Sequence, residues 1–509
     1  MLAAMPLPPT TTPSGDETPV RGRDDACPGA LRLHPADDGS LARVRVPGGL
    51  LTARQAVALG RLAEELGDGR LDITSRGNLQ VRGLDTGCGA ELAARLRAAG
   101  LLPSDRHDRV RNIVASPLSG LDGGGHADVA AWVRSLDAVL CDDSPAGGGE
   151  LSGLSGRFLF ALDDGRGDVA ALGADVTLIA TPDGGAVLRA GGPPPGPDVP
   201  SPSTGAARPD AAGRRGSRTA GSAVGGGLRV RGEDAPRAAA LAAVEFLAKA
   251  RESGTRAWRA RELPARHAVT TEGLAARLAD AGVAAVPVEH EPAPRARATP
   301  PAPGPIPGPD GRHALSVALP LGRVSAAQWQ LLAALASRGG AAELRMTPWR
   351  GVVLPGFAPD DTRGALAELS DAGLVTTPDS PWLGVGACTG RPGCAKSLAD
   401  VRADTARMVA DPALRTSGTR RGFADPAPGA SGTAWSDPLP VYISGCERRC
   451  GHPGGRWVDA LATGDRDYRV TVRGAREDTP EADSADSVHS VDVTAEQLAG
   501  AVAAARGTT

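Results

Sequence analysis

Hydrophobic and polar positions follow the same order in two distant parts of the chain. The first part begins with VPGGLLTARQA, continues with an Ala/Leu pattern at helical spacing, and reaches the alternating segment LDITSRGNLQV around Thr74. The second part begins with LPLGRVSAAQW and reaches LRMTPWRGVVL around Thr347. Each pattern predicts strand, turn, helix, strand and helix, with Thr52 or Ser325 capping the first helix. Each part is therefore predicted to be a small α+β unit.

One constant offset relates the two parts without a gap. Pro47 corresponds to Pro320, which sets the offset at 273 residues (320 − 47). The same offset aligns the sequence AGL at 99–101 with AGL at 372–374. Agreement at one offset over about fifty residues indicates an internal duplication. We therefore predict two related halves.

Composition narrows the classes of function. The 509 residues suffice for about three or four domains, and a net charge of −3 gives no overall basic surface, so we expect no nucleic-acid partner. No apolar run is long enough to span a membrane, and the N-terminus lacks the regions of a signal peptide, so we expect a cytoplasmic protein without a membrane partner. We find neither a GxGxxG fingerprint nor a Walker A loop, so the sequence offers no recognisable dinucleotide or nucleotide site.

Three segments are predicted to lack a packed structure. Residues 1–25 form the N-terminus, residues 192–226 are rich in Pro, Gly and Ser, and residues 290–312 are rich in Pro without periodicity. Strand and helix patterns resume after the second segment, which indicates an insertion within a domain. The third segment is predicted to link the two halves of the molecule.

Four of the seven cysteines fall in two pairs near the C-terminus. Cys388 and Cys394 lie in CTGRPGC, whereas Cys446 and Cys450 lie in CERRC. Four thiolates from two loops are typical of a metal or iron–sulfur site. Zinc sites usually pair cysteines about two to four residues apart, so a five-residue gap followed by a three-residue gap favours an iron–sulfur cluster, with zinc as the alternative.

The cysteine site has no counterpart in the first half of the duplication. The offset places Ala115 opposite Cys388 and Leu121 opposite Cys394, so the first half carries no thiol at the equivalent positions. We therefore predict a pseudo-twofold protein with one cluster and one site between its halves. The remaining cysteines are predicted to be small buried hydrophobes without a ligand role: Cys27, Cys88 and Cys141.

Several segments together resemble the nitrite and sulfite reductase superfamily. They are LDITSRGNLQVRGL, RNIVASP, LRMTPWRGVVLPG, CTGRPGC and ISGCERRCGHP. The resemblance implies an α+β fold in which duplicated ferredoxin-like half-domains alternate with α/β domains, with one [4Fe–4S] cluster. It divides the chain into a first half-domain (26–106), a first α/β domain without cluster ligands (107–289), a second half-domain (313–380) and an iron–sulfur α/β domain with a flexible tail (381–509).

Within that superfamily, two segments are most similar to the precorrin-3B synthases. They are ACPGALRLHPADDGSLARVRVPGGLLT and SGCERRCGHP. This similarity implies a monooxygenase of aerobic cobalamin synthesis, which hydroxylates precorrin-3A at C20 and closes a γ-lactone. Sulfite reductases carry a Lys-Phe-Lys pattern, whereas GRFLFALDDG has Arg157 and then Leu159, which weakens the grip on a small dianion.

The resemblance also implies a binding site for a free tetrapyrrole in the place of sirohaem. Arg76 and Arg111 match the anion-binding arginines of the family, and a planar guanidinium suits a carboxylate. The second substrate would be dioxygen, and a separate NADH-linked reductase or ferredoxin would donate electrons. The candidate substrate-binding residues are Arg76, Asn78, Arg82, Arg111 and Arg157.

Other interpretations stay open at this stage. One is a sirohaem-dependent sulfite or nitrite reductase, in which Cys450 would also bridge to the haem iron, and another is a zinc-stabilised scaffold without enzymatic activity. His452 could ligate a second, mononuclear non-haem iron, although a lone loop histidine usually has no such role. Trp349 is predicted to pack in the second half-domain, and DDG at 163–165 is predicted to form a turn.

Overall fold

The structure, a computed structural model, describes residues 25, 27–142, 149–191, 226–288, 300–416, 438–474 and 490–507. The predicted N-terminal segment 1–25 and the predicted insertion 192–226 lie outside the described residues except for one residue each. Residues 290–299 of the predicted linker also lie outside them. No helix in the described ranges is long and apolar enough to cross a membrane.

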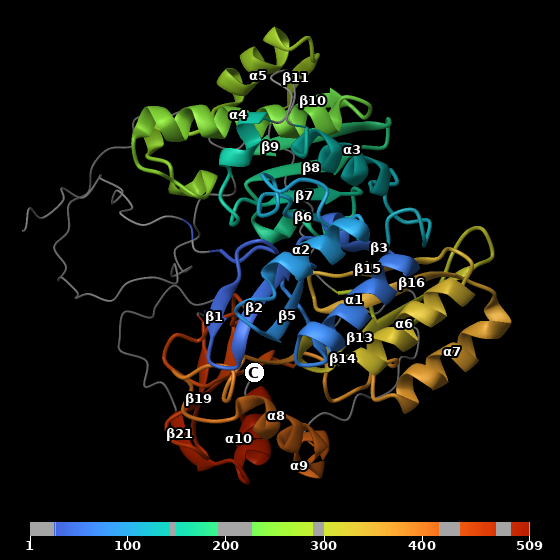
Figure 1. The fold of residues 1–509 in the computed structure, drawn as a ribbon, viewed down its shortest axis with the longest axis vertical. Helices are drawn as coiled ribbons and strands as arrows, with labels where there is room; N and C mark the ends of the chain where they lie inside the picture. The colour runs from blue at the N-terminus through green and yellow to red at the C-terminus, as the bar shows by residue number, and fades with distance from the viewer. Residues whose placement is uncertain are drawn as a thin grey trace, which may run out of the picture.

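The two duplicated units form one central body with a shared hydrophobic core, and the two α/β domains lie on opposite sides of it (Figure 1). Helix α1 (Ala53–Leu66) of the first unit packs against helix α6 (Ala326–Arg338) of the second. The indole N–H of the buried Trp329 donates to the carbonyl oxygen of Ala56 at 2.8 Å across this contact. The outer helices are α2 (Gly89–Ala98) and α7 (Pro359–Asp371).

The caps of the two central helices confirm the duplication. Thr52 accepts the backbone N–H of Gln55, whose side chain accepts the N–H of Thr52 in return. Ser325 and Gln328 form the same capping box in the second unit. Both boxes satisfy backbone donors that a helix start would otherwise leave unpaired.

Each unit contributes one strand to the sheet of the other unit. The first sheet has the order β1-β2-β5-β4-β14 and the second has the order β12-β13-β16-β15-β3. The strand that follows each proline turn pairs with a strand of the other unit across the pseudo-twofold axis. The two half-domains therefore share their sheets. The strands are β1 (His34–Ala36), β2 (Gly39–Val44), β3 (Leu50–Thr52), β4 (Arg70–Ile73), β5 (Leu79–Leu84), β13 (His313–Ala318), β14 (Arg323–Ser325), β15 (Glu343–Met346) and β16 (Gly351–Phe357).

Part of the predicted linker is a strand, which corrects the expectation of an extended connector over 290–312. Strand β12 (Gly304–Pro307) pairs antiparallel with β13 at the edge of the second sheet. An edge position tolerates Pro305 and Pro307, because a proline there need not donate to a further strand.

The two α/β domains share one strand pattern. In the first, β6, β7 and β8 run parallel and are followed by antiparallel strands; in the second, β17, β18 and β19 do the same. The first contains β6 (Ile113–Ala115), β7 (Phe160–Asp163), β8 (Val176–Ala180), β9 (Gly185–Ala190), β10 (Gly227–Arg231), β11 (Ala285–Val288), α3 (Ala130–Leu140), α4 (Ala235–Ser253) and α5 (Thr271–Asp280). The second contains β17 (Val385–Ala387), β18 (Val441–Ser444), β19 (Trp457–Ala462), β20 (Asp467–Arg473), β21 (Ser490–Thr494), α8 (Val401–Ala410), α9 (Pro412–Thr416) and α10 (Leu498–Gly507).

Candidate functional site

The four predicted ligand cysteines follow the ends of two neighbouring parallel strands. Cys388 comes directly after β17, and Cys446 comes two residues after β18. Parallel strands end at the same edge of a sheet, so the two loops meet there. The backbone N–H of Cys388 donates to the carbonyl of Ile443 at 3.0 Å, and the N–H of Gly445 points at the Cys388 sulfur at 3.2 Å. The two loops therefore form one thiol-lined site.

The electrostatics of this site suit a bound cation or cluster. Burial raises the pKa of the Cys388 thiol, and the neighbouring Cys446 and Cys394 raise it further. Burial likewise raises the pKa of the Cys450 thiol, with contributions from Cys446, Cys388 and Cys394. Four thiolates crowded together repel one another, and a positively charged metal centre removes that repulsion. The residues present therefore fit a metal group.

A group of three carboxylates also lies close together among the described residues, since ligand atoms of Asp163, Asp164 and Asp168 come within 4.8 Å of one another. At the cysteine site, the choice of an iron–sulfur cluster over zinc stays a prediction from the cysteine spacing in the sequence.

The first half-domain holds the loop between Cys388 and Cys394 in place. Arg82 forms two hydrogen bonds of 2.8 Å with the carboxylate of Asp38 and donates to the carbonyl of Gly393 at 2.9 Å. Gly393 leaves no room for a side chain, because an added Cβ would lie 2.7 Å from the Asp38 carboxylate. Arg82 was predicted to bind substrate, but the structure places its buried guanidinium in this internal contact.

Arg76 lies in a group of arginines with few negative partners. Its guanidinium donates to the carbonyl of Gly156 at 3.2 Å, and it forms no ion pair within the described ranges. Burial, together with the positive charge of Arg259, lowers the pKa of Arg76 to about 10. Next to Gly156, the exposed Arg157 stacks on the ring of Trp258, 4.8 Å from its centroid. This Arg76 region is electropositive and suits an anionic ligand.

Two other predicted substrate-binding residues are occupied within the protein. Arg111 is 4 % exposed and forms two hydrogen bonds of 2.7 Å with Asp137. The side chain of Asn78 accepts the N–H of Val46 at 3.0 Å and donates to Asn112 at 3.1 Å. Both side chains therefore have internal partners in the first half, which differs from their predicted role in substrate binding.

A short turn of the second half-domain lies between the two α/β domains. Trp349 has the predicted packing role, but it packs against an apolar group of the first α/β domain that includes Val114 and Leu159 and not within the second half-domain. The next residue, Arg350, hydrogen bonds to Tyr442, whose hydroxyl donates to the carbonyl of Cys450. The turn therefore contacts both the first α/β domain and the surroundings of the cysteine site.

A cavity of about 1040 Å³ lies beside the loop between Cys388 and Cys394. Its walls include Thr389 and Gly393 from that loop and Arg323 and Arg402 from neighbouring elements. This volume is at the upper end of ordinary ligand pockets, which span about 300–1,000 Å³. None of the five predicted substrate-binding residues is among its described lining residues. The cavity is therefore distinct from the Arg76 region.

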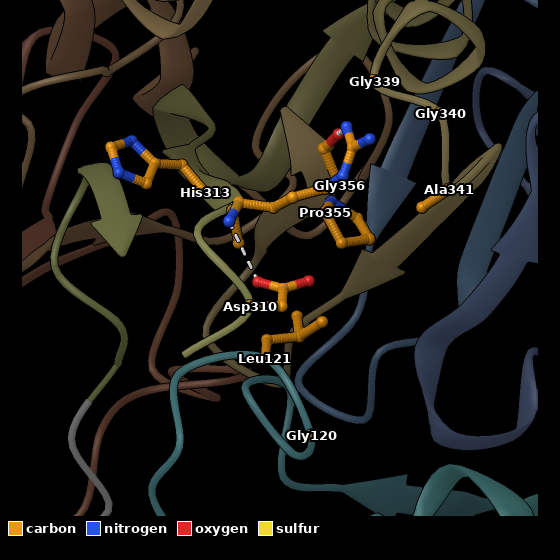
Figure 2. A pocket seen from close by; sticks show the side chains of 11 residues that line it. Gly120, Leu121, Asp310, His313, Gly339, Gly340, Ala341, Pro355 and Gly356 are labelled. Carbon is orange, nitrogen blue, oxygen red and sulfur yellow. Dashed lines mark hydrogen bonds between the residues drawn. The ribbon is translucent and has the colours of Figure 1, made fainter. Parts of the chain in front are cut away.

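A smaller cavity of about 290 Å³ lies where the first α/β domain meets the second half-domain (Figure 2). Asp310 accepts the backbone N–H of Arg312 at 3.0 Å, and the Arg312 side chain donates to the carbonyl of Gly356 at 2.9 Å. Asp310 and Arg312, two charged residues that line this cavity, therefore make hydrogen bonds within the protein. The cavity contains none of the candidate site residues.

The local contacts of His452 and Asp163 concern two remaining sequence predictions, an iron ligand and a turn. His452 is exposed and stacks on Trp457 with ring centroids 5.2 Å apart, while its Nδ1 faces the carbonyl of Pro453 at 2.8 Å. The carboxylate of Asp163 accepts four backbone N–H groups of the loop that follows it, as a turn requires. The predicted turn at 163–165 is thus confirmed, and a mononuclear iron at His452 stays a prediction.

Comparisons with known proteins identify the central body. The family model "Nitrite/Sulfite reductase ferredoxin-like half domain" matches residues 34–99 and 306–372. A ferredoxin–nitrite reductase of Synechococcus elongatus is 40% identical over 131 residues, covering 25% of each chain. A precorrin-3B synthase of a Sinorhizobium species is 34% identical over 118 residues, covering 23% of this chain and 25% of that protein. The chain thus matches about a quarter of the length of these relatives.

The fold extends well beyond these matched segments. The solved structure of the Mycobacterium tuberculosis NirA protein covers 90% of this chain and 79% of its own, with a TM-score of 0.61 and 20% identity. At this identity the likeness shows the fold alone. The chain carries two ferredoxin-like half domains of the nitrite and sulfite reductase type within a nitrite/sulfite reductase-like fold.

Proposed function

We propose that the chain is an oxygen-dependent precorrin-3B synthase, which hydroxylates precorrin-3A at C20 and closes a γ-lactone. The observation that carries this proposal is Leu159, a buried apolar side chain at the position where the sulfite reductase pattern has a second cation. Leu159 packs with Val114 in the apolar group that Trp349 also contacts. An apolar side chain in place of a second cation suits the face of a macrocycle better than it suits a small dianion.

The arginines would bind and orient the carboxylates of the substrate. Arg76 has a backbone carbonyl as its described hydrogen-bond partner, so its other N–H groups can meet a carboxylate. Arg157 is exposed beside it on Trp258 and can turn towards a ligand. Fixing a polycarboxylate at several points limits its rotation and so presents one carbon to the oxidant.

Cys388, Cys394, Cys446 and Cys450 would hold a [4Fe–4S] cluster, which supplies single electrons when bound. The N–H of Gly445 is placed to hydrogen bond the Cys388 thiolate at 3.2 Å. The overall reaction takes two electrons and two protons, places one oxygen atom on the substrate and reduces the other to water. A separate NADH-linked reductase or ferredoxin would provide the electrons.

The alternative is a sirohaem-dependent nitrite or sulfite reductase. The observation that favours it is the 40% identity to the Synechococcus elongatus nitrite reductase, against 34% to the Sinorhizobium precorrin-3B synthase. A sulfite reductase hemoprotein of Acidithiobacillus ferrooxidans is also 35% identical over 107 residues. Under this alternative, the Arg76 region would bind a small anion next to the haem.

One experiment separates the two functions. The protein is purified without oxygen, and its iron, sulfide and visible spectrum are measured. A precorrin-3B synthase should contain about four irons and four sulfides with a broad absorbance and no haem bands. It should then convert precorrin-3A to its lactone only when dioxygen and an electron donor are present. Sirohaem bands with turnover of nitrite or sulfite would instead establish the alternative.

A further inference from the structure

Arg45 is a buried guanidinium with no acidic partner in the part of the chain that the structure describes. It is 1 % exposed, its Nη1 has no hydrogen-bond partner, and it forms no ion pair among the described residues. Its other nitrogens donate to the carbonyls of Arg109 and Pro28 at 3.3 and 3.2 Å. Asp108 attracts it from a distance, but that carboxylate accepts the N–H groups of Ala30 and Leu31. Among the described residues, Arg45 therefore lacks the neutralising contact that buried charges usually have.

Burial is the main reason why the pKa of Arg45 falls to about 10, and the pKa of Arg76 falls to about 10 for the same reason. The two guanidinium groups also repel each other, since Arg45 contributes to the lowered pKa of Arg76. Arg45 and Arg76 lie close in space, since Cys27 contacts Arg45 and faces the carbonyl of Gly156 that Arg76 also contacts. A buried charge left without a partner lowers stability, so such a pair is retained where a ligand neutralises it.

Cys27 lies beside Arg45 and near Arg76. Its sulfur is 3.5 Å from Nη2 of Arg45 and 3.6 Å from Nη1 of Arg43, and its thiol faces the carbonyl of Gly156 at 3.5 Å. The same carbonyl accepts the guanidinium of Arg76. Cys27, Arg45 and Arg76 thus converge on one point, and the half-buried Cys27 and Arg76 connect that point with the surface.

We propose that Arg45, Arg76 and Cys27 form one subsite for a single carboxylate of the polycarboxylate substrate. The carboxylate takes the free Nη1 of Arg45 and the free donors of Arg76, with the Cys27 side chain against it. This inference rests on the proposed function for the identity of the ligand. It adds Arg45 and Cys27, which sequence motifs had not indicated, to the residues that bind it.

A matched pair of variants tests the subsite. Arg45→Met should weaken binding of precorrin-3A about ten- to a hundred-fold, because charge-assisted hydrogen bonds are lost. It should not lower the melting temperature of the ligand-free protein, because it removes an unpaired buried charge. Arg111→Met should do the opposite, since it breaks the buried pair with Asp137 and leaves binding unchanged. Arg45→Lys, which keeps the charge without the planar fork, should bind with intermediate affinity.

Alkylation of Cys27 gives an independent measurement. Iodoacetamide labelling of the cluster-loaded protein is followed by mass spectrometry of the Cys27 peptide under anaerobic conditions. Bound precorrin-3A should slow labelling at least ten-fold in the wild-type protein and much less in Arg45→Met. Wild-type affinity in Arg45→Met, a melting temperature lowered as much as in Arg111→Met, or unchanged labelling with ligand would each overturn the subsite.

The outcomes distinguish this inference from the proposed function. If precorrin-3A binds the wild-type protein and Arg45→Met equally well, the subsite is wrong while the proposed substrate stands. If precorrin-3A does not bind but sulfite protects Cys27 in an Arg45-dependent manner, the subsite stands as an anion site and the proposed substrate is wrong.

Discussion

Replacing Gly445 by alanine should prevent assembly of the iron–sulfur cluster. Gly445 lies between the end of β18 and Cys446, where its backbone packs against the loop that carries Cys394. An added Cβ would lie 1.8 Å from the hydroxyl oxygen of Ser397 and 2.8 Å from its Cβ. Real Cβ contacts of this length do not occur, so the two cluster loops would have to separate.

The size of the effect follows from how tightly Ser397 is held. Ser397 is 1 % exposed, and its hydroxyl donates to the carbonyl of Ala399 at 2.8 Å. Moving it would break that hydrogen bond, which is worth about 1 kcal/mol, and overpacking adds about 1–3 kcal/mol. The total of about 2–4 kcal/mol is a large part of the usual stability of a domain. This free-energy cost would weaken the contact in which the N–H of Gly445 lies 3.2 Å from the Cys388 sulfur.

Iron and sulfide content after anaerobic reconstitution measures this effect. Gly445→Ala should retain a small fraction of the wild-type iron, whereas the control Gly454→Ala should load normally, because nothing lies within 4 Å of a Cβ at that position. Adding Ser397→Gly to Gly445→Ala should restore part of the loading, since the nearest Ser397 atom would then be its Cα at 3.3 Å. Full iron in Gly445→Ala alone would refute the reasoning.

Three further predictions concern ligands, pH and the insertion. Cys446→Ser should lose the cluster absorbance, whereas Cys88→Ser should keep it; full iron and sulfide in Cys446→Ser would disprove the ligand assignment. Burial raises the pKa of Asp168 to about 6, so its contribution to stability should fall as pH rises from about 4 to 6 and stay lower above that range. Urea denaturation should show a flatter pH dependence in Asp168→Asn, and an unchanged slope would exclude this carboxyl as the cause. Deleting 195–222, outside the described residues, should preserve cluster loading because β9 and β10 are antiparallel neighbours that a short turn can join; insoluble or cluster-free protein would contradict this.

Local features of the sequence predicted the repeated architecture well. The caps at Thr52 and Ser325 depend on contacts within one helical turn, so the sequence shows them directly. The constant offset reaches further, since Trp329 donates across the helix pair to Ala56, which is 273 residues away. The exchange of β3 and β14 between sheets was not predicted, because three-residue strands have little pattern and their partners are distant in sequence.

The arginines show where sequence reasoning stops. Family motifs drew attention to Arg76 and Arg111 alike, yet the carboxylate of Asp137 neutralises only Arg111. Which arginine has an acidic partner depends on folding, because that partner comes from another element of the chain. A signal for Arg45 was present, since a charged residue in RVRVPGG directly follows a half-buried strand, but the pattern alone cannot show that it lacks a partner.

The two α/β domains differ at equivalent loops, and the paired cysteines lie only in the second domain. The loop after β7 in the first α/β domain occupies the place of the loop after β18 in the second. In the first domain, the carboxylate of Asp163 accepts four backbone N–H groups of its loop and so satisfies them internally. In the second, Gly445 directs its N–H at the Cys388 sulfur. In the first domain, a carboxylate thus satisfies the backbone N–H groups of the loop. In the second domain, the equivalent loop carries thiols that can bind a metal group.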